Sequence, residues 1–255
     1  MRIWLPFHIE TVADAPIVAI DAGSVEQAVE EARAAAALAS EAVEKALENE
    51  RKAREAQVRI HAHNQEISGK FFGKPAGWKS LAGGQYLGYT DFDHEGDIVP
   101  HGEGEQWFPS GNYCCGEFHM QHGKGLTFWR FADGAERVGW FDARANTGSC
   151  VDRAPNGVIA AGDFAPGGMG YTQKLGLIQY PDESQYLGYC DFTREADYWA
   201  PSGFGVWDSG RSLTCAGYFE DGLLSGECEI ATPSGRVGGR ASLGRLIGKA
   251  SEIDF

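Results

Sequence analysis

The sequence lacks several features that would place a protein in a familiar class. No stretch of its 255 residues approaches the roughly 18 apolar residues that a membrane-spanning helix needs. The opening segment, residues 1–7, is short and broken by Pro6, so we expect no secretory signal there. Positive charge is also scarce, since 22 Lys and Arg face 36 Asp and Glu and give a net charge of −14. Nucleic acids and anionic membranes attract cationic surfaces, so this charge disfavours both as direct partners and favours a partner with a basic surface.

Motifs for chemistry are equally scarce. The six cysteines show no regular framework, so we expect reduced thiols and a cytoplasmic protein. The glycine-rich stretches 167–170 and 235–239 lack the strand–loop–helix setting of a phosphate-binding loop, and we read them as turns. There is no Gly-x-Ser-x-Gly elbow and no Ser, His and Asp set at a useful spacing. We therefore expect no cofactor and no enzymatic activity.

One cluster of metal-ligand residue types was weighed separately. Cys114, Cys115, His119 and His122 lie close together in the sequence, with His101 nearby. A zinc site needs four ligands within tetrahedral reach. Adjacent residues of a strand point to opposite faces, so the two cysteines cannot share a site. We expect no metal here.

Glycine and repetition are what the sequence has in abundance. Its 35 glycines, with many aromatic residues, predict tight turns and short strands. The phrase Gln85–Phe92 returns one hundred positions later as Gln185–Phe192, with Thr90 replaced by Cys190. Such an echo indicates a chain built from stacked copies of one unit.

A long helix is predicted before the repeats. Ser24 and Gln27 have the spacing of a capping box. Small apolar residues then recur in steps of three and four, with Glu50 as an interruption: Val29, Ala32, Ala36, Ala39, Val43, Ala46 and Ala53. This spacing is typical of a coiled-coil seam, which would pair two chains, but it also suits a helix packed along its own domain.

The repeat unit is visible in two short motifs. Gly-x-aromatic pairs occur at Gly116/Phe118, Gly139/Phe141, Gly162/Phe164 and Gly217/Phe219, and the first three are 23 residues apart. Gly-x-Gly occurs at 102–104, 123–125 and 203–205, with degraded copies at 148–150 and 226–228. Turn pairs such as Asp133-Gly134 separate them, and we expect Asp-Gly and Asn-Gly to supply the positive φ angles of tight hairpins.

Together these motifs resemble the MORN repeat over residues 84–240, most clearly at 101–141 and 203–219. The resemblance implies that about six β-hairpins stack into an elongated sheet. With the helix predicted from its own spacing, we expect a mainly β fold with a long N-terminal helix. The expected segments are a short hairpin at 1–23, the helix at 24–68, a linker at 69–83, the array at 84–240 and a tail at 241–255.

Two acidic inserts and three tryptophans are the candidate partner-binding residues. The inserts, Asp93–Pro100 and Thr193–Ala200, lengthen the two units that carry the repeated phrase, and inserts in a repeat often carry function. The candidates are Asp93, Glu95, Asp97, Glu195 and Asp197 in the inserts, and Trp107, Trp129 and Trp207 beside the turns. The alternatives are solvated loops for the acids and stacking between repeats for the rings.

The sequence thus predicts a non-enzymatic protein-binding scaffold or adaptor, as the resemblance to MORN arrays implies. One alternative is an acidic inhibitor, such as a phage-encoded protein that mimics nucleic acid and blocks a basic host protein. A second is an enzyme with a site in the irregular repeats around 162–200.

The helical seam generates a testable prediction. We expect a dimer or higher oligomer through residues 24–66, because an alanine seam packs closely against a second helix. Light scattering at high micromolar concentration measures this directly. A monomer with a folded helix would contradict it.

Overall fold

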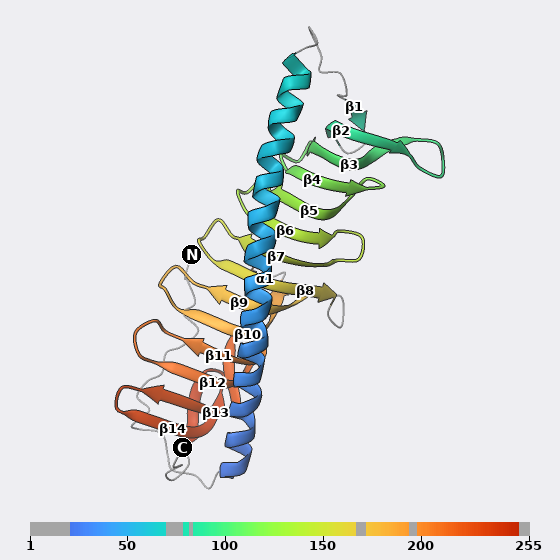
Figure 1. Ribbon diagram of the computed structural model, residues 1–255. Coiled ribbons are helices and arrows are strands. Elements are labelled where there is room, and N and C mark those ends of the chain that lie inside the picture. Colours follow the sequence, from blue (N-terminus) through green and yellow to red (C-terminus); the bar gives the residue numbers. More distant parts are fainter. Residues whose placement is uncertain (1–20, 70–78, 82–83, 167–171, 194–197, 250–255) are drawn as a thin grey trace. The chain divides into compact units, whose positions relative to one another are not determined.

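The structure, a computed structural model, describes residues 21–69, 79–81, 84–166, 172–193 and 198–249. Its elements are one helix followed by antiparallel strands (Figure 1). They are α1 (Ala22–Gly69), β1 (Lys79–Leu81), β2 (Gly84–Phe92), β3 (Ile98–Trp107), β4 (Tyr113–His119), β5 (His122–Arg130), β6 (Glu136–Asp142), β7 (Thr147–Arg153), β8 (Ile159–Pro166), β9 (Thr172–Gln179), β10 (Gln185–Thr193), β11 (Tyr198–Asp208), β12 (Thr214–Glu220), β13 (Leu223–Thr232), β14 (Gly235–Ser242) and β15 (Arg245–Lys249).

The chain divides into two compact units. The central unit comprises residues 43–166 and holds β1–β8, and the C-terminal unit comprises residues 1–42 and 167–255 and holds β9–β15. Within each unit every strand pairs antiparallel with the next one along the chain. A mainly β fold with one N-terminal helix is therefore confirmed, but the estimate of about six hairpins was too low.

The strands also extend beyond the limits predicted for the array. β1 lies in the segment read as a linker, and β15 lies in the segment read as a tail. Most of the hairpin predicted at 1–23 lies outside the described residues. α1 is long, but among the residues that the structure describes no helix is apolar enough to cross a membrane.

The hairpin turns are of two kinds. Some are two-residue loops with positive φ at both residues, such as the β4–β5 turn, where φ is 47° at Met120 and 64° at Gln121, and others are three-residue loops. In the β5–β6 turn the amide of Phe131 donates to the carbonyl of Ala135, and that of Gly134 donates to Phe131. Only Gly134 has a positive φ, of 92°, while the Asp133 carboxylate accepts the amide of Ala135 at 2.9 Å. In this Asp-Gly pair the positive φ therefore comes from the glycine alone, whereas both residues of Asp221-Gly222 supply it, with φ of 50° and 82°. The three-residue loops are type I turns closed by one left-handed residue, and Asp or Asn stabilises them through its side chain.

A row of small residues crosses the strands of each unit. In the central unit it consists of Gly88, Gly104, Gly116, Thr127, Gly139, Cys150 and Gly162. In the C-terminal unit it consists of Gly176, Gly188, Gly205, Gly217, Cys228 and Gly239. The two degraded Gly-x-Gly copies, 148–150 and 226–228, thus place Cys150 and Cys228 in this row. The strands keep the same register even where a cysteine replaces the glycine.

The repeated phrase occupies the same place in both units. The Tyr86 ring makes an edge contact with Phe118 at 5.4 Å, and the Tyr186 ring makes one with Phe219 at 4.9 Å. A Cβ added to Gly104 would lie 2.2 Å from the Tyr86 hydroxyl. The glycine therefore makes room for a neighbouring ring, as expected from the sequence.

The next row along the strands faces α1. In the central unit it consists of Leu87, Glu105, Cys115, Phe128, Val138, Val151 and Ala161. We call this side of the sheet the helix face, because Ala53 and Ile60 pack on Cys115 and Phe128. The opposite side is the ring face, where Tyr86, Cys114 and Phe118 form a buried cluster. Cys114 and Cys115 therefore lie on opposite faces, which confirms the reason for rejecting a metal site between them.

The alanine seam of α1 is buried against the strands of its own chain. Val25, Val29 and Ala32 pack on Ala216 in the C-terminal unit. Ala46 packs on Val151 and Ala161 in the central unit. This is the arrangement in which the helix packs along its own domain. The exposed apolar residues of the helix are Leu38, Leu47 and Val58, so self-association through 24–66 stays a prediction that would use this outer surface.

The helix begins earlier than its sequence signal suggested. Asp21 is the N-cap, because its carbonyl accepts the amides of Ser24 and Val25 and its carboxylate accepts the Ser24 hydroxyl at 2.8 Å. The Gln27 amide bonds to Glu31 instead of reaching back to the cap. The capping box predicted at Ser24 and Gln27 was therefore wrong.

All six cysteines are buried and unpaired by disulfides: Cys114, Cys115, Cys150, Cys190, Cys215 and Cys228. Burial raises the pKa of Cys115 to about 12 and that of Cys228 to about 12. Burial also raises the thiol pKa of Cys114 and Cys215. Thiols with raised pKa hold little thiolate, so these cysteines serve as small packing residues.

The glycine row generates a prediction. A Cβ at Gly116 would lie 2.3 Å from the carbonyl oxygen of Leu126, so Gly116→Val collides with the backbone of the neighbouring strand. We expect a loss of more than about 2 kcal/mol and a clearly lower Tm in a thermal melt. Gly134→Val is the matched control, since Gly134 has a positive φ but no atom within 4 Å. Equal losses of stability in both variants would show that the row needs glycine because of strain at positive φ, and not because of the collision with the neighbouring strand.

Candidate functional site

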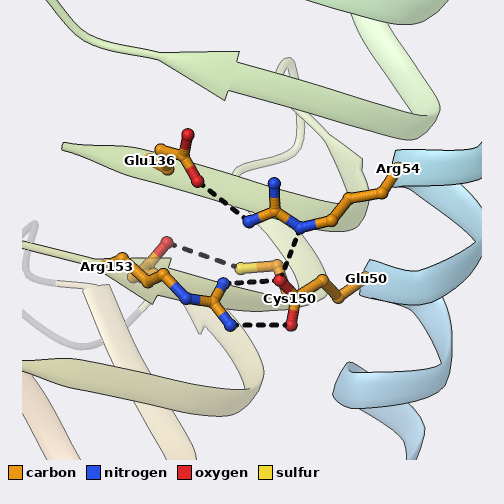
Figure 2. A network of polar contacts seen from close by, with 6 residues as sticks. Glu50, Arg54, Glu136, Cys150 and Arg153 are labelled. Carbon is orange, nitrogen blue, oxygen red and sulfur yellow. Dashed lines mark hydrogen bonds and ion pairs between the residues drawn. The ribbon is translucent and has the colours of Figure 1, made fainter. Parts of the chain in front are cut away.

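Ion pairs join the helix to the sheet in the central unit. Glu50 accepts two hydrogen bonds from Arg153 at the end of β7, at 2.5 and 3.1 Å. It also accepts the Nε–H of Arg54 at 2.8 Å, and Arg54 donates onward to Glu136 on β6 at 2.8 Å. Figure 2 shows these four side chains meeting between α1 and the strands. The residue read from the sequence as an interruption of the seam is therefore one of its anchors.

Glu50 is charged in this setting. Its burial raises the pKa of the carboxyl group, but the hydrogen bonds and charges of Arg153 and Arg54 outweigh burial and hold the pKa below its ordinary value of 4.5. A carboxylate with a depressed pKa stabilises the fold at neutral pH and loses that contribution as the pH falls through the folded-state pKa. The network therefore fixes the helix best at neutral pH.

A second polar cluster lies further along the helix. Glu105 on β3 is 1% exposed, and the Tyr113 hydroxyl donates to it at 2.6 Å. The Asn64 amide donates to its other oxygen at 2.9 Å, and His61 Nδ1 lies 2.9 Å away. A buried carboxylate is costly unless it is paired and hydrogen-bonded, so these contacts hold the C-terminal part of α1 in one position on the sheet.

The first acidic insert is a hairpin tip and not a separate loop. β2 runs to Phe92 and β3 starts at Ile98, which leaves only a short turn between them. Oδ1 of Asp93 accepts the amides of Glu95 and Asp97, each at 2.9 Å. Asp93 is thus structural, whereas the carboxylates of Glu95 and Asp97 stand at the exposed tip.

The same hairpin exposes large apolar side chains. Tyr89 is 64% exposed, Phe92 is 63% exposed and Ile98 is 39% exposed. Phe92 and Ile98 lie opposite each other in the β2–β3 register. The sequence analysis did not name these three residues, although Tyr89 and Phe92 belong to the repeated phrase. Their signal was an apolar residue adjoining an acidic insert, where no partner within the repeat is available.

The three predicted tryptophans do not join this surface. Trp107 packs against the helix-face cluster, with its ring 5.4 Å from Tyr113. Trp129 lies in the ring-face cluster and stacks on Phe108 at 5.4 Å. Trp207 is buried in the C-terminal unit, opposite Tyr186. The reading of these rings as packing residues fits their positions better than the reading as exposed contact anchors.

The second insert cannot be compared in full. Glu195 and Asp197 lie outside the described residues. Nearby, the Ser202 hydroxyl donates to Asp191 at 2.7 Å, and the Asp182 carboxylate accepts both the amide and the hydroxyl of Ser184. These acids are engaged in local hydrogen bonds at different ends of β10. Among the described residues no group of three or more His, Cys, Asp or Glu could hold a metal ion.

Comparison of the sequence with models of known protein families found no match, and comparison with curated proteins found none either. The function is therefore argued from the chain itself.

The Glu50 network generates a prediction. Glu50→Leu should lower the free energy of unfolding by about 2 kcal/mol, because it leaves Arg153 and Arg54 without their shared partner. Adding Arg153→Leu should cost less than the sum of the single changes, with a coupling of about 1 kcal/mol in denaturant melts. The difference between wild type and Glu50→Leu should shrink below pH 4.5 as the carboxylate protonates.

The control pair for this cycle is Glu48 and Arg51, which form an exposed i,i+3 ion pair on α1. We expect no measurable coupling there, since exposed pairs are screened by water. Equal coupling in both cycles would contradict an anchoring role for Glu50.

Proposed function

We propose that this chain is a non-enzymatic scaffold that binds a protein partner through the surface of a MORN-type hairpin sheet, with α1 as its internal support. The observation that carries the proposal is the exposed apolar tip of the β2–β3 hairpin. Three large apolar side chains are exposed together on one hairpin, and such patches commonly mark interaction sites. The partner surface must therefore offer an apolar contact.

The charge of the hairpin defines the partner further. Residues 84–107 contain six acidic residues and no lysine or arginine. Glu103 and Glu105 are paired with Arg59 and His61 of α1, whereas the tip acid Glu95 lies 3.7 Å from His94, a residue of the same exposed turn. A partner that combines apolar and basic residues fits this hairpin in both respects.

The ion pairs of α1 favour a scaffold over a mimic of nucleic acid. Mimicry needs a row of free carboxylates with phosphate-like spacing. The helix instead neutralises sheet acids in both units, where it pairs Arg59 with Glu103, Arg54 with Glu136, Lys45 with Asp163 and Arg33 with Glu229. Carboxylates that form ion pairs with the helix are not free to bind the basic surface of a partner.

Selection of random peptides displayed on phage, with the whole chain immobilised, tests the proposal. We expect enriched peptides to combine basic with apolar residues and to bind with strong salt dependence in fluorescence anisotropy. The double change Tyr89→Ser and Phe92→Ser should weaken binding about tenfold or more, since it removes two exposed apolar contacts.

The matched control is Leu243→Ser with Ile247→Ser, which removes two side chains that are 77% and 50% exposed in the C-terminal unit. The control should bind as wild type does. No enrichment, or equal binding by both double variants, would overturn the proposal.

A further inference from the structure

An open hollow lies on the helix face of the central unit, beside α1. It has a volume of about 520 Å³, and its walls come from β3, β4, β5 and β6. Its polar lining includes Glu103, Glu117, Lys124, His101 and His119, and Trp140 also lines it. The hollow does not include Tyr89, Phe92 or Ile98, although Gly102 in its lining lies next to Tyr89.

Two carboxylates of the hollow face each other across neighbouring strands. Glu103 and Glu117 are direct partners in the β3–β4 register. Like charges in this position destabilise a sheet unless something neutralises them. Arg59 does so for Glu103, with hydrogen bonds of 2.6 and 2.7 Å. Lys124, which lines the hollow, is paired with Asp142 at 3.0 Å.

Glu117 has no cation in direct contact. Within the described residues no ion pair or hydrogen bond of its carboxylate is found, and only the more distant charge of Arg59 acts on it, after Glu103. The carboxylate is held close to the backbone, since a Cβ added to Gly125 would lie 2.3 Å from Glu117 Oε2. The hollow therefore presents a negative charge that is only partly neutralised, at a defined position.

The fold itself does not require acids at this place. In the C-terminal unit the corresponding positions, before and after the paired row glycines Gly205 and Gly217, hold Phe204 and Tyr218. These rings contact each other edge-on at 5.3 Å. An apolar pair suits the repeat without charge repulsion. Glu103 is explained by its ion pair with Arg59 of α1, so Glu117 is the glutamate that calls for another explanation than folding.

The remaining wall offers an aromatic surface. Trp140 on β6 is 41% exposed and lines the hollow. An indole face attracts cations, and a planar guanidinium can stack on it while it donates two hydrogen bonds to a carboxylate. An ammonium group offers no flat surface for stacking.

We propose that this hollow binds the guanidinium group of an arginine side chain on the protein partner, with Glu117 as its ion-pair partner and Trp140 as its stacking surface. The inference rests on the proposed scaffold function and identifies one side chain that the partner must supply. Because Glu117 and Trp140 lie on β4 and β6 and the apolar residues Tyr89 and Phe92 lie on β2, each site can be tested with its own variants.

The probe is a fluorescein-labelled peptide of four Gly-Arg repeats, titrated with the whole chain by anisotropy. The matching peptide of Gly-Lys repeats should bind about threefold or more weakly, and a peptide of Gly-citrulline repeats, which is neutral, about tenfold or more weakly. Glu117→Gln and Trp140→Leu should each weaken Gly-Arg binding by about threefold to tenfold. In the wild type the peptide should also shift the Trp140 indole N–H signal in an NMR spectrum, and that signal is assigned by its loss in Trp140→Leu.

The matched controls are Tyr218→Leu, whose ring is 42% exposed, and Glu220→Gln, both in the C-terminal unit. They should leave Gly-Arg binding unchanged. Glu117→Gln should not lower the Tm, because it removes a like-charge contact, so a folding defect will not obscure the result. Unchanged binding in both Glu117→Gln and Trp140→Leu, or equal binding of the citrulline peptide, would overturn the inference. Selected peptides that still depend on Tyr89 and Phe92 would then leave the scaffold proposal intact.

Discussion

The docking of α1 on the strands through small side chains is the contact on which the rest of each unit depends. A single sheet leaves one face in water unless a second layer covers it. Alanine buries little area, but it lets the helix backbone come close to the strands. At that distance Glu50 and Arg54 reach Arg153 and Glu136, so polar contacts add what the small apolar contacts lack. The small side chains therefore allow both the close approach of the helix and the ion pairs that form across it.

The row of small residues fixes the backbone, and this leaves the chemistry of the helix face free to vary. On the ring face the aromatic residues lie over the row and are constrained by it. On the helix face beyond α1, the residues between the motif positions meet no such demand. The same place can hold Glu103 and Glu117 in one unit and Phe204 and Tyr218 in the other. One backbone thus carries two surfaces of different chemistry.

The motifs predicted the strands well, because Gly-x-aromatic and the turn glycines are local signals of backbone shape. The contacts of α1 were not predictable in the same way. Glu50 interrupts a pattern along the helix, and its partner Arg153 lies 103 residues away, beyond any periodicity. The helix is capped by Asp21 and not by the predicted Ser24. Both residue types can cap a helix, and sequence spacing alone does not choose between them. Trp140 could have been found, because a residue between Gly139 and Phe141 must face away from the ring that follows it.

The buried cysteines can report which unit of the chain unfolds. Each unit carries three thiols that water does not reach in the folded state, and unfolded thiols return to an ordinary pKa and react readily. A brief pulse of alkylating reagent followed by mass analysis would therefore mark whichever unit had opened. Cys114 and Cys115 would distinguish further between loss of the ring face and release of the helix, because they lie in different clusters of the same strand. The repeat thus contains probes on both sides of its sheet, without any added label.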